Sequence, residues 1–109
     1  MAYDENLAAR ISAILSNQEN LTEKNMFGGV GYLLNGNMAC GVHKEFLIVR
    51  VGPANYQTAL DAPHTKVFDM TGRPMTGWVM VTPDGCADEA ALSVWVQKGL
   101  TFASSLPAK

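Results

Sequence analysis

Few side chains in this sequence have the type and spacing that chemistry requires. The two imidazoles, His43 and His64, have no carboxylate or cysteine near them at a metal-ligand spacing such as HxxxH or HExxH. The two thiols, Cys40 and Cys86, form no CxxC motif, and no GxSxG motif or other nucleophile with an evident base is present. We therefore expect no catalytic residue, no metal and no cofactor, and we predict that the protein is not an enzyme.

A glycine-rich segment and a carboxylate pair are better explained by structure than by chemistry. Residues 27–31 (FGGVG) have the composition of a phosphate-binding loop, but they lie inside a predicted strand. A dinucleotide fingerprint instead joins a strand to a helix. Asp88 and Glu89 stand where a helix is predicted to begin, so capping and the helix dipole account for both.

The least generic segment is the loop at 69–75 (DMTGRPM), which combines two methionines and an arginine with Gly and Pro. Two interpretations stay open. The methionines fill the sheet edge while Asp69 pairs with Arg73, or the loop forms an adaptable recognition surface. In a small-molecule-binding domain or an uncharacterised enzyme, Arg50 and Arg73 would hold an anion. The candidate ligand-binding residues are then Met26, Phe27, Arg50, Met70, Arg73 and Met75.

The composition predicts one globular domain over residues 1–109. Hydrophobic residues make up 48% of the chain and charged residues 17%, which is enough apolar material for a core. The net charge is -2, the pI is about 5.5, and the basic residues are scattered. Because phosphate binding draws on clustered Lys and Arg, direct nucleic-acid binding is not expected. One alternative hypothesis for the function remains nucleic-acid binding, in which bases would stack on aromatic side chains of the sheet.

Targeting signals are also missing from the sequence. The N-terminus, MAYDENLAAR, lacks the basic and apolar regions of a signal peptide, and no stretch approaches the ~20 apolar residues of a transmembrane helix. Two cysteines far apart in sequence are most simply reduced thiols, the alternative being a redox pair or a nucleophile. We therefore expect a cytoplasmic protein with no membrane association.

Apolar spacing predicts a helix near each end of the chain and a shorter one between them. Residues 4–18 place Leu7, Ile11 and Leu15 on one stripe, with Asp4 as the N-cap. The short helix covers 54–60. The last helix covers 88–104, where Gly99 costs about 1 kcal/mol relative to Ala.

The region 25–52 predicts two consecutive hairpins. Asn35 and Gly36 tolerate the positive φ of a type I′ turn, and Lys44 and Glu45 form a second reversal. The first register pairs Leu34 with Asn37, Leu33 with Met38, Tyr32 with Ala39, Gly31 with Cys40, Val30 with Gly41 and Gly29 with Val42. The second pairs His43 with Phe46, Val42 with Leu47, Gly41 with Ile48, Cys40 with Val49 and Ala39 with Arg50.

These registers assign every strand residue to one of two faces, because paired residues share a face. The core face carries Phe27, Leu33, Met38, Cys40, Val42, Leu47, Val49 and Val51. The other face carries Val30, Tyr32, Ala39, Gly41, His43, Phe46, Ile48 and Arg50. The second face is too apolar for a solvent face, so we expect it to be covered or to bind a partner. The candidate interface residues are Tyr32, Phe46, Ile48 and Arg50.

The remaining strands are a short edge strand at 67–68 and a strand at 78–81. The order of elements is α-βββ-α-ββ-α. It predicts an α+β fold of two layers, with an antiparallel sheet of about five strands and helices on one face.

Several ordered blocks resemble the N-terminal domain of TfoX/Sxy competence regulators. They are KNMFGGVGY (24–32), NGNM (35–38), LIVRV (47–51), FDMTGRPMTGWV (68–79), WVQKGLTFA (95–103) and SLP (105–107). The resemblance covers nearly the whole chain. It implies a two-layer α+β domain in the bacterial cytoplasm that often self-associates.

The resemblance also implies a role in regulation. Full-length members are positive regulators of natural-competence genes, act with a cyclic-AMP receptor protein and carry a second, C-terminal domain. The sequence ends at Lys109 without one, so we expect a stand-alone N-domain. The family supplies no catalytic residues. The leading hypothesis is a non-enzymatic regulatory module that acts through protein contacts and forms a homodimer.

Overall fold

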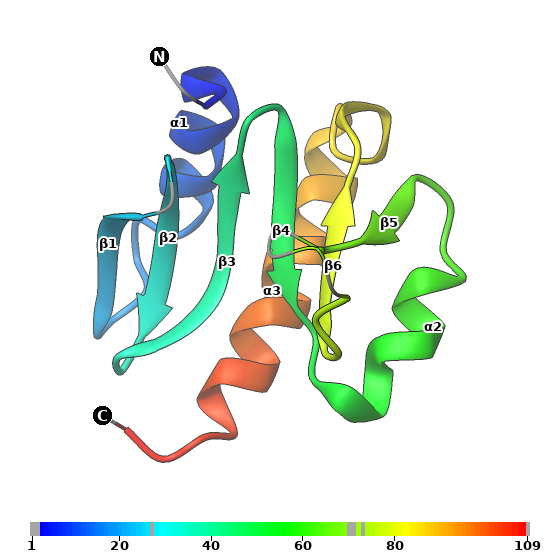
Figure 1. The fold of residues 1–109 in the computed structure, drawn as a ribbon. Helices are drawn as coiled ribbons and strands as arrows, with labels where there is room; N and C mark the ends of the chain where they lie inside the picture. The colour runs from blue at the N-terminus through cyan, green and yellow to red at the C-terminus, as the bar shows by residue number, and fades with distance from the viewer. Residues whose placement is uncertain (1–2, 27, 70–71, 73, 109) are drawn as a thin grey trace.

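The computed structural model describes residues 3–26, 28–69, 72 and 74–108, except the side chain of Met26. It has two layers, a sheet with helices behind it (Figure 1). The elements in chain order are α1 (Glu5–Ile14), β1 (Leu21–Met26), β2 (Gly29–Leu34), β3 (Asn37–His43), β4 (Phe46–Arg50), η1 (Pro53–Asn55), α2 (Tyr56–Leu60), β5 (Thr65–Val67), β6 (Trp78–Val81), η2 (Pro83–Gly85) and α3 (Glu89–Ser104). The predicted α+β class is confirmed.

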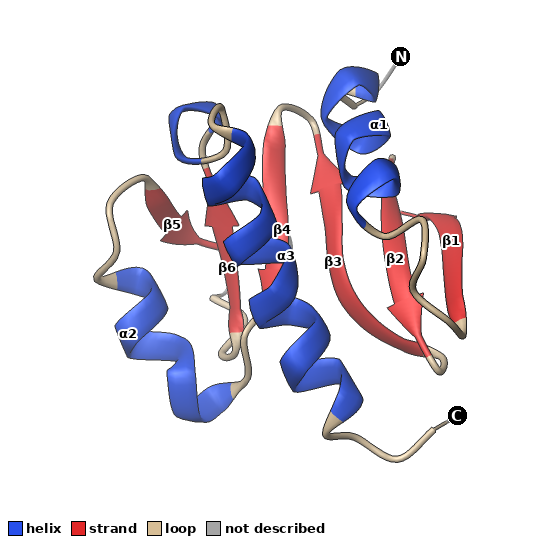
Figure 2. Cartoon of the chain, turned by 180° about the vertical axis from the view of Figure 1, so that it is seen from behind, coloured by secondary structure: helices blue, strands red, loops and turns tan. Residues whose placement is uncertain are grey.

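The sheet has six strands in the order β1-β2-β3-β4-β6-β5, and every neighbouring pair is antiparallel. Figure 2, seen from behind, shows α1 and α3 crossing one face, with α2 beside α3 near β5 and β6. The predicted placement of the helices on one face is confirmed. The other face, turned towards the viewer in Figure 1, carries no helix of the described part of the chain.

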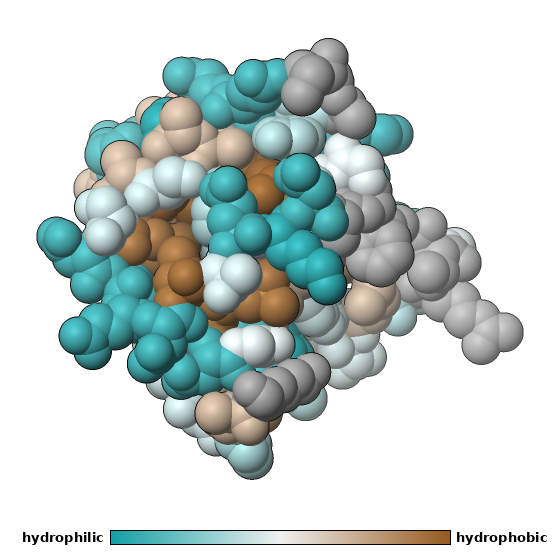
Figure 3. All heavy atoms as spheres, turned by 90° about the vertical axis from the view of Figure 1, so that its left-hand side faces the viewer, coloured by the Kyte–Doolittle hydropathy of each residue, from teal (hydrophilic) through white to brown (hydrophobic). Residues whose placement is uncertain are grey.

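The sixth strand is β1, which the sequence prediction missed. Its four central residues, 22–25, are polar and exposed, so they show no apolar alternation. Figure 3 looks at this side of the molecule, where hydrophilic side chains surround a small hydrophobic area. An edge strand of this polarity is typical of sheets that resist pairing with other chains.

The two long helices begin where the caps predict. The Asp4 carboxylate accepts a hydrogen bond from the Leu7 amide at 3.0 Å, and that of Asp88 accepts from the Ala91 amide at 3.2 Å. These bonds satisfy amides that have no partner within the helix. Helix α1 ends at Ile14, four residues earlier than the predicted 18.

Both predicted hairpin turns are present. Asn35 and Gly36 have φ of 53° and 84°, as a type I′ turn requires, and Lys44 has φ of 55°. The second register is confirmed from the pair His43 and Phe46 through to the pair Cys40 and Val49.

The first register is wrong beyond its second pair. Leu33 pairs with Met38 as predicted, but Tyr32 pairs with Cys40 rather than Ala39. Ala39 is the extra residue of a β-bulge, and one extra residue moves the side chains beyond it to the opposite face. The faces predicted for β2 are therefore exchanged. Val30 and Tyr32 lie in the core, whereas Leu33 and Met38 lie on the helix-free face.

The bulge lies where α3 comes closest to the sheet. A Cβ atom added at Gly99 would stand 2.3 Å from the carbonyl oxygen of Ala39. Only glycine lets the helix approach the bulged backbone so closely. Gly99 therefore carries the helix–sheet contact, which outweighs its poor helix propensity.

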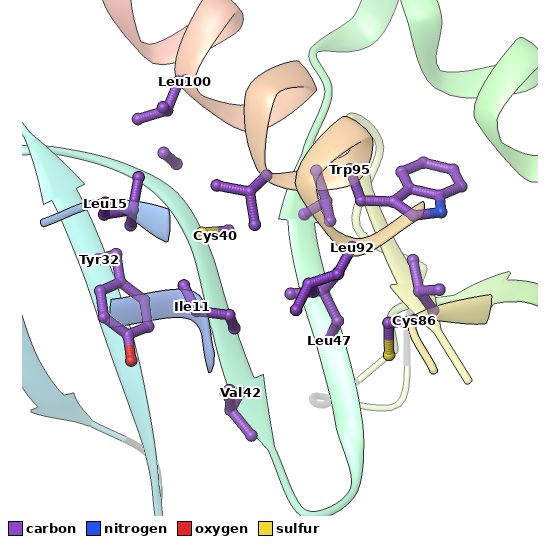
Figure 4. Packing of buried hydrophobic residues seen from close by; sticks show 14 of the residues in the cluster. Ile11, Leu15, Tyr32, Cys40, Val42, Leu47, Cys86, Leu92, Trp95 and Leu100 are labelled. Carbon is purple, nitrogen blue, oxygen red and sulfur yellow. The ribbon is translucent and has the colours of Figure 1, made fainter. Parts of the chain in front are cut away.

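The core lies between the helices and the covered face of the sheet. Figure 4 shows Tyr32 beside Ile11 of α1 and its C-cap Leu15, and Leu47 beside Leu92 of α3. All of these side chains are at most 3% exposed. Among the described residues, no helix is both long and apolar enough to cross a membrane.

Candidate functional site

The helix-free face of the sheet is defined by the strand registers. Ile48 pairs with Met80, which pairs with Lys66, and Arg50 pairs with Trp78. The described side chains of this face are Thr22, Lys24, Leu33, Met38, His43, Phe46, Ile48, Arg50, Lys66, Trp78 and Met80. Thr22, Lys24 and Lys66 are exposed, Ile48 is buried, and the others are partly exposed. The face combines aromatic rings, methionines and cations, which interface cores favour, apart from lysine.

Two facing glycines form the floor of this surface at β2 and β3. Gly31 pairs with Gly41, and a Cβ atom added at Gly41 would lie 2.9 Å from the Met38 methyl carbon. The Met38 side chain therefore covers the backbone of β3 and occupies the space that a larger residue would take. This contact also verifies that Met38 lies on the helix-free side.

Arg50 is held between two aromatic rings at the end of β4. Its Cζ atom lies 5.2 Å from the centroid of the Trp78 ring and 5.3 Å from that of Phe102. Phe102 reaches this position from α3 because Gly52, with φ of 87°, has no side chain. A Cβ there would stand 2.4 Å from a carbon of the Phe102 ring. Among the described residues, no carboxylate forms an ion pair with Arg50.

Trp78 is further fixed by Phe68, which is buried. The two ring centroids lie 6.2 Å apart with the planes tilted by 45°. The adjoining backbone is also bonded, because the Gly77 carbonyl accepts hydrogen bonds from the amides of Val51 and Gly52. The aromatic side of the guanidinium contact is therefore held in place by its neighbours.

A second cation–aromatic contact lies at the other end of β4. The Lys66 ammonium stands 5.6 Å from the centroid of the Phe46 ring. His43 is the strand partner of Phe46, and its Nδ1 atom is buried without a hydrogen-bond partner among the described residues. Burial lowers the pKa of His43, and the charge of Lys44 lowers it further.

The structure places the four candidate interface residues in different environments. Tyr32 is 1% exposed and belongs to the core, so its assignment to an interface is wrong. Its hydroxyl donates to the Ala8 carbonyl at 3.0 Å, and burial raises its pKa to about 12. Ile48 lies on the predicted face but is 2% exposed. Phe46 and Arg50 lie on the helix-free face and are partly exposed.

The candidate ligand-binding residues are only partly placed. Phe27, Met70, Arg73 and the side chain of Met26 lie outside the described residues. Arg50 and Met75 are described, and the Met75 amide donates to the Phe68 carbonyl at 2.9 Å. The predicted pocket between the two arginines is therefore neither assembled nor excluded by the described residues.

Both thiols are buried and unpaired. Burial raises the pKa of Cys40 to about 12, and it also raises that of Cys86. The thiolate is the nucleophilic form of cysteine, so neither side chain is activated. Among the described residues, no group of three His, Cys, Asp or Glu side chains could hold a metal ion.

The sequence prediction missed half of this surface. Leu33 and Met38 were placed in the core because the bulge at Ala39 leaves no sequence signal. Trp78 and Met80 alternate with Val79 and Val81, and this period of two could have placed them opposite the core. The contact of Phe102 with Arg50 joins residues far apart in sequence and gives no local signal.

The architecture is that of a small α+β domain in which one face of an antiparallel sheet is covered by helices and the other carries an aromatic, cationic surface. The sequence model of the TfoX N-terminal domain matches residues 13–103. The chain therefore belongs to the TfoX N-terminal domain family. No curated protein and no solved structure gives a significant match.

Proposed function

We propose that this protein is a non-enzymatic regulatory module that acts through protein contacts made by the helix-free face. The first partner is a second copy of the chain. Membership of the TfoX N-terminal domain family supports a role in transcription regulation. The two buried, unpaired cysteines fit a reducing compartment such as the cytoplasm.

The observation that carries the proposal is that this face has many apolar side chains although no described helix covers it. Leu33, Met38, Phe46, Trp78 and Met80 lie on one side of the sheet, and no helix packs over them. Antiparallel sheets with one solvent-exposed face normally carry polar residues on that face. Two sheets that pack face to face stand about 10 Å apart and bury such side chains between them.

A charge reversal at Phe46 tests the proposal. Light scattering should give twice the chain mass for the parent protein and a single-chain mass for Phe46→Glu. The new carboxylate can pair with Lys66, whose ammonium lies close to the Phe46 ring, so the fold should persist. Ala13→Glu, at an exposed position of α1, is the matched control and should remain dimeric.

Salt adds an independent readout. Arg50 and Lys66 bring positive charge to both copies, so screening should strengthen self-association rather than weaken it. A parent protein that stays monomeric at every salt and protein concentration would refute self-association through this face. A dimer that persists in Phe46→Glu would assign the contact to another surface.

A second function, anion binding, is favoured by the arrangement of Arg50. Its guanidinium is fixed between two rings and has no carboxylate partner among the described residues. A fixed planar fork with free donors is suited to carboxylate or phosphate.

Titration with inorganic phosphate and with succinate, followed by backbone amide NMR, tests this function. Saturable shifts at Val51 and Trp78 that disappear in Arg50→Gln are expected if an anion binds. The absence of saturation at about 10 mM, a concentration that corresponds to a very weak complex, would reject it.

A further inference from the structure

A groove of about 1000 Å³ lies between α2 and α3, on the opposite layer from the helix-free face. Its lining is formed by Val51, Asn55, Thr58, Ala59, Ala62, Ala90, Ser93, Val94, Trp95, Gln97, Lys98, Thr101, Phe102 and Ser105. Val94 is 56% exposed, the most exposed large hydrophobic residue of the described chain, and Trp95 is 8% exposed. The groove therefore presents apolar surface that the domain does not cover.

The shape of the groove follows from the spacing of its lining residues along α3. Besides Trp95, the lining residues of α3 and its C-cap Ser105 stand at positions 90, 93, 94, 97, 98, 101, 102 and 105. This alternation of three and one is a continuous face of a helix. Fifteen steps of ~1.5 Å make it about 22 Å long. Helix α2 has five residues and spans only part of that length, so the groove is an elongated slot rather than a closed pocket.

The side chains of this slot suit a helix as the occupant. Its ends carry small residues, Ala90 and Ser93 at one end and Thr101 and Ser105 at the other. Small side chains let a second helix approach closely, and apolar grooves of this length commonly hold amphipathic helices. Trp95 and Phe102 provide the larger apolar contacts of the slot.

The charge of the slot restricts the partner. Among the described residues of the lining, Lys98 is the single ionisable side chain and none is a carboxylate. Its ammonium lies 5.9 Å from the centroid of the Trp95 ring and forms no ion pair with any described residue. An occupant with a carboxylate near its centre would therefore find an unpaired cation.

A second copy of the chain fits the slot poorly. In an antiparallel pairing of two α3 helices about the middle of the stripe, Lys98 of one copy would stand beside Gln97 and Lys98 of the other. In a parallel pairing the two lysines would face each other. Like charges placed opposite each other are unfavourable, and the stripe offers no acid in compensation.

We propose that the slot between α2 and α3 binds an amphipathic helix of a different protein, with apolar residues at helical spacing and a central Glu or Asp that pairs with Lys98. This surface lies on the helical layer and meets the helix-free face at Phe102, whose ring also contacts Arg50. Its occupation would leave the strand residues of that face open. One domain would then join a second copy on one side and a heterologous helix on the other.

The test uses two helical peptides of about 18 residues, or ~27 Å of helix. Both have leucines on one face and differ only in a central Glu or Lys. In a Trp78→Phe background Trp95 is the remaining tryptophan, so its fluorescence reports binding in the slot. The Glu peptide should bind about tenfold more tightly than the Lys peptide, and Lys98→Glu should reverse that order.

Two further variants locate the contact. Val94→Glu should weaken the Glu peptide about tenfold or more, because it places a like charge in the slot one helical turn from Lys98. Ala13→Glu, which adds the same charge on α1 outside the slot, should leave the affinity unchanged.

Three results would overturn the proposal. The first is that neither peptide produces a saturable change in Trp95 fluorescence. The second is that both peptides bind equally and Lys98→Glu has no effect. The third is that Val94→Glu converts a dimer to a monomer in light scattering, which would assign the slot to contact between copies of the chain.

Discussion

The two faces of the sheet differ in the types of side chain that they carry and in how far those side chains are exposed. The covered face carries aliphatic residues and a thiol, such as Val42, Leu47, Val49 and Cys40, which are at most 2% exposed. The helix-free face carries Phe46, Trp78, two methionines and three cations among its described residues. The same six strands thus provide a core on one side and a partly exposed, adaptable surface on the other.

The difference shows where each face obtains its stability. The covered face is stabilised by the close packing of α1 and α3, in which every lost methyl group leaves a cavity. The helix-free face is ordered by contacts between rings and cations, each contributing about 0.5–2 kcal/mol. The first arrangement resists substitution, whereas the second leaves side chains available to a partner.

The largest expected change in stability comes from comparing the same replacement, leucine by alanine, at one position on each face. Leu47→Ala, in the covered core, should lower the free energy of unfolding by about 2–5 kcal/mol. Leu33→Ala, on the helix-free face, should lower it by less than about 1.5 kcal/mol, because its side chain is partly exposed and leaves no closed cavity. Urea unfolding of the two variants measures the difference. Equal losses would mean that the two faces are not distinct.

A smaller effect is expected where α3 meets the bulge. Gly99→Ala should lower stability by about 1–3 kcal/mol, although Ala is favoured by about 1 kcal/mol in a helix interior. The added methyl group would collide with the Ala39 carbonyl. Thermal unfolding measures the change, with Gln97→Ala as an exposed control on the same helix. A stabilised Gly99→Ala would show that the helix does not approach the bulge this closely.

The smallest effect is a pH dependence on the helix-free face. The pKa of His43 is lowered in the folded state, so the unfolded chain binds more protons at acid pH. The contribution of His43 to stability should be complete above about pH 6.5 and should be lost as the pH falls through the lower folded value. His43→Gln should reduce the decline in Tm between about pH 8 and about pH 5 relative to the parent protein. An identical decline in the parent protein and in His43→Gln would contradict the assignment.

Much of the fold was predictable from local signals. The caps Asp4 and Asp88, the Asn35–Gly36 turn and the second hairpin register all follow from residues that are close in sequence. The polar edge strand β1 was not predictable, because its exposed residues have no apolar alternation. The bulge at Ala39 was not predictable either, because the residue that makes room for it, Gly99, is more than fifty positions away in the sequence.

The candidate site was predictable in kind but not in membership. An apolar second face with Phe46 and Arg50 followed from alternation alone. Tyr32 was assigned to it wrongly, because a single extra residue exchanges the faces of a strand. The rings on both sides of Arg50 come from β6 and α3, so the contact depends on tertiary packing that no short segment encodes.

The most direct test of the central claim is the position of the surface that changes on self-association. Methyl NMR of protein labelled at methionine and leucine can follow Met38 and Met80 on the helix-free face, with Leu47 and Leu92 in the core as internal references. On dilution, the Met38 and Met80 methyl signals should shift with a single dissociation constant, while those of Leu47 and Leu92 stay fixed. Shifts confined to other methyl groups, or none at any concentration, would contradict the assignment of the helix-free face as the contact surface.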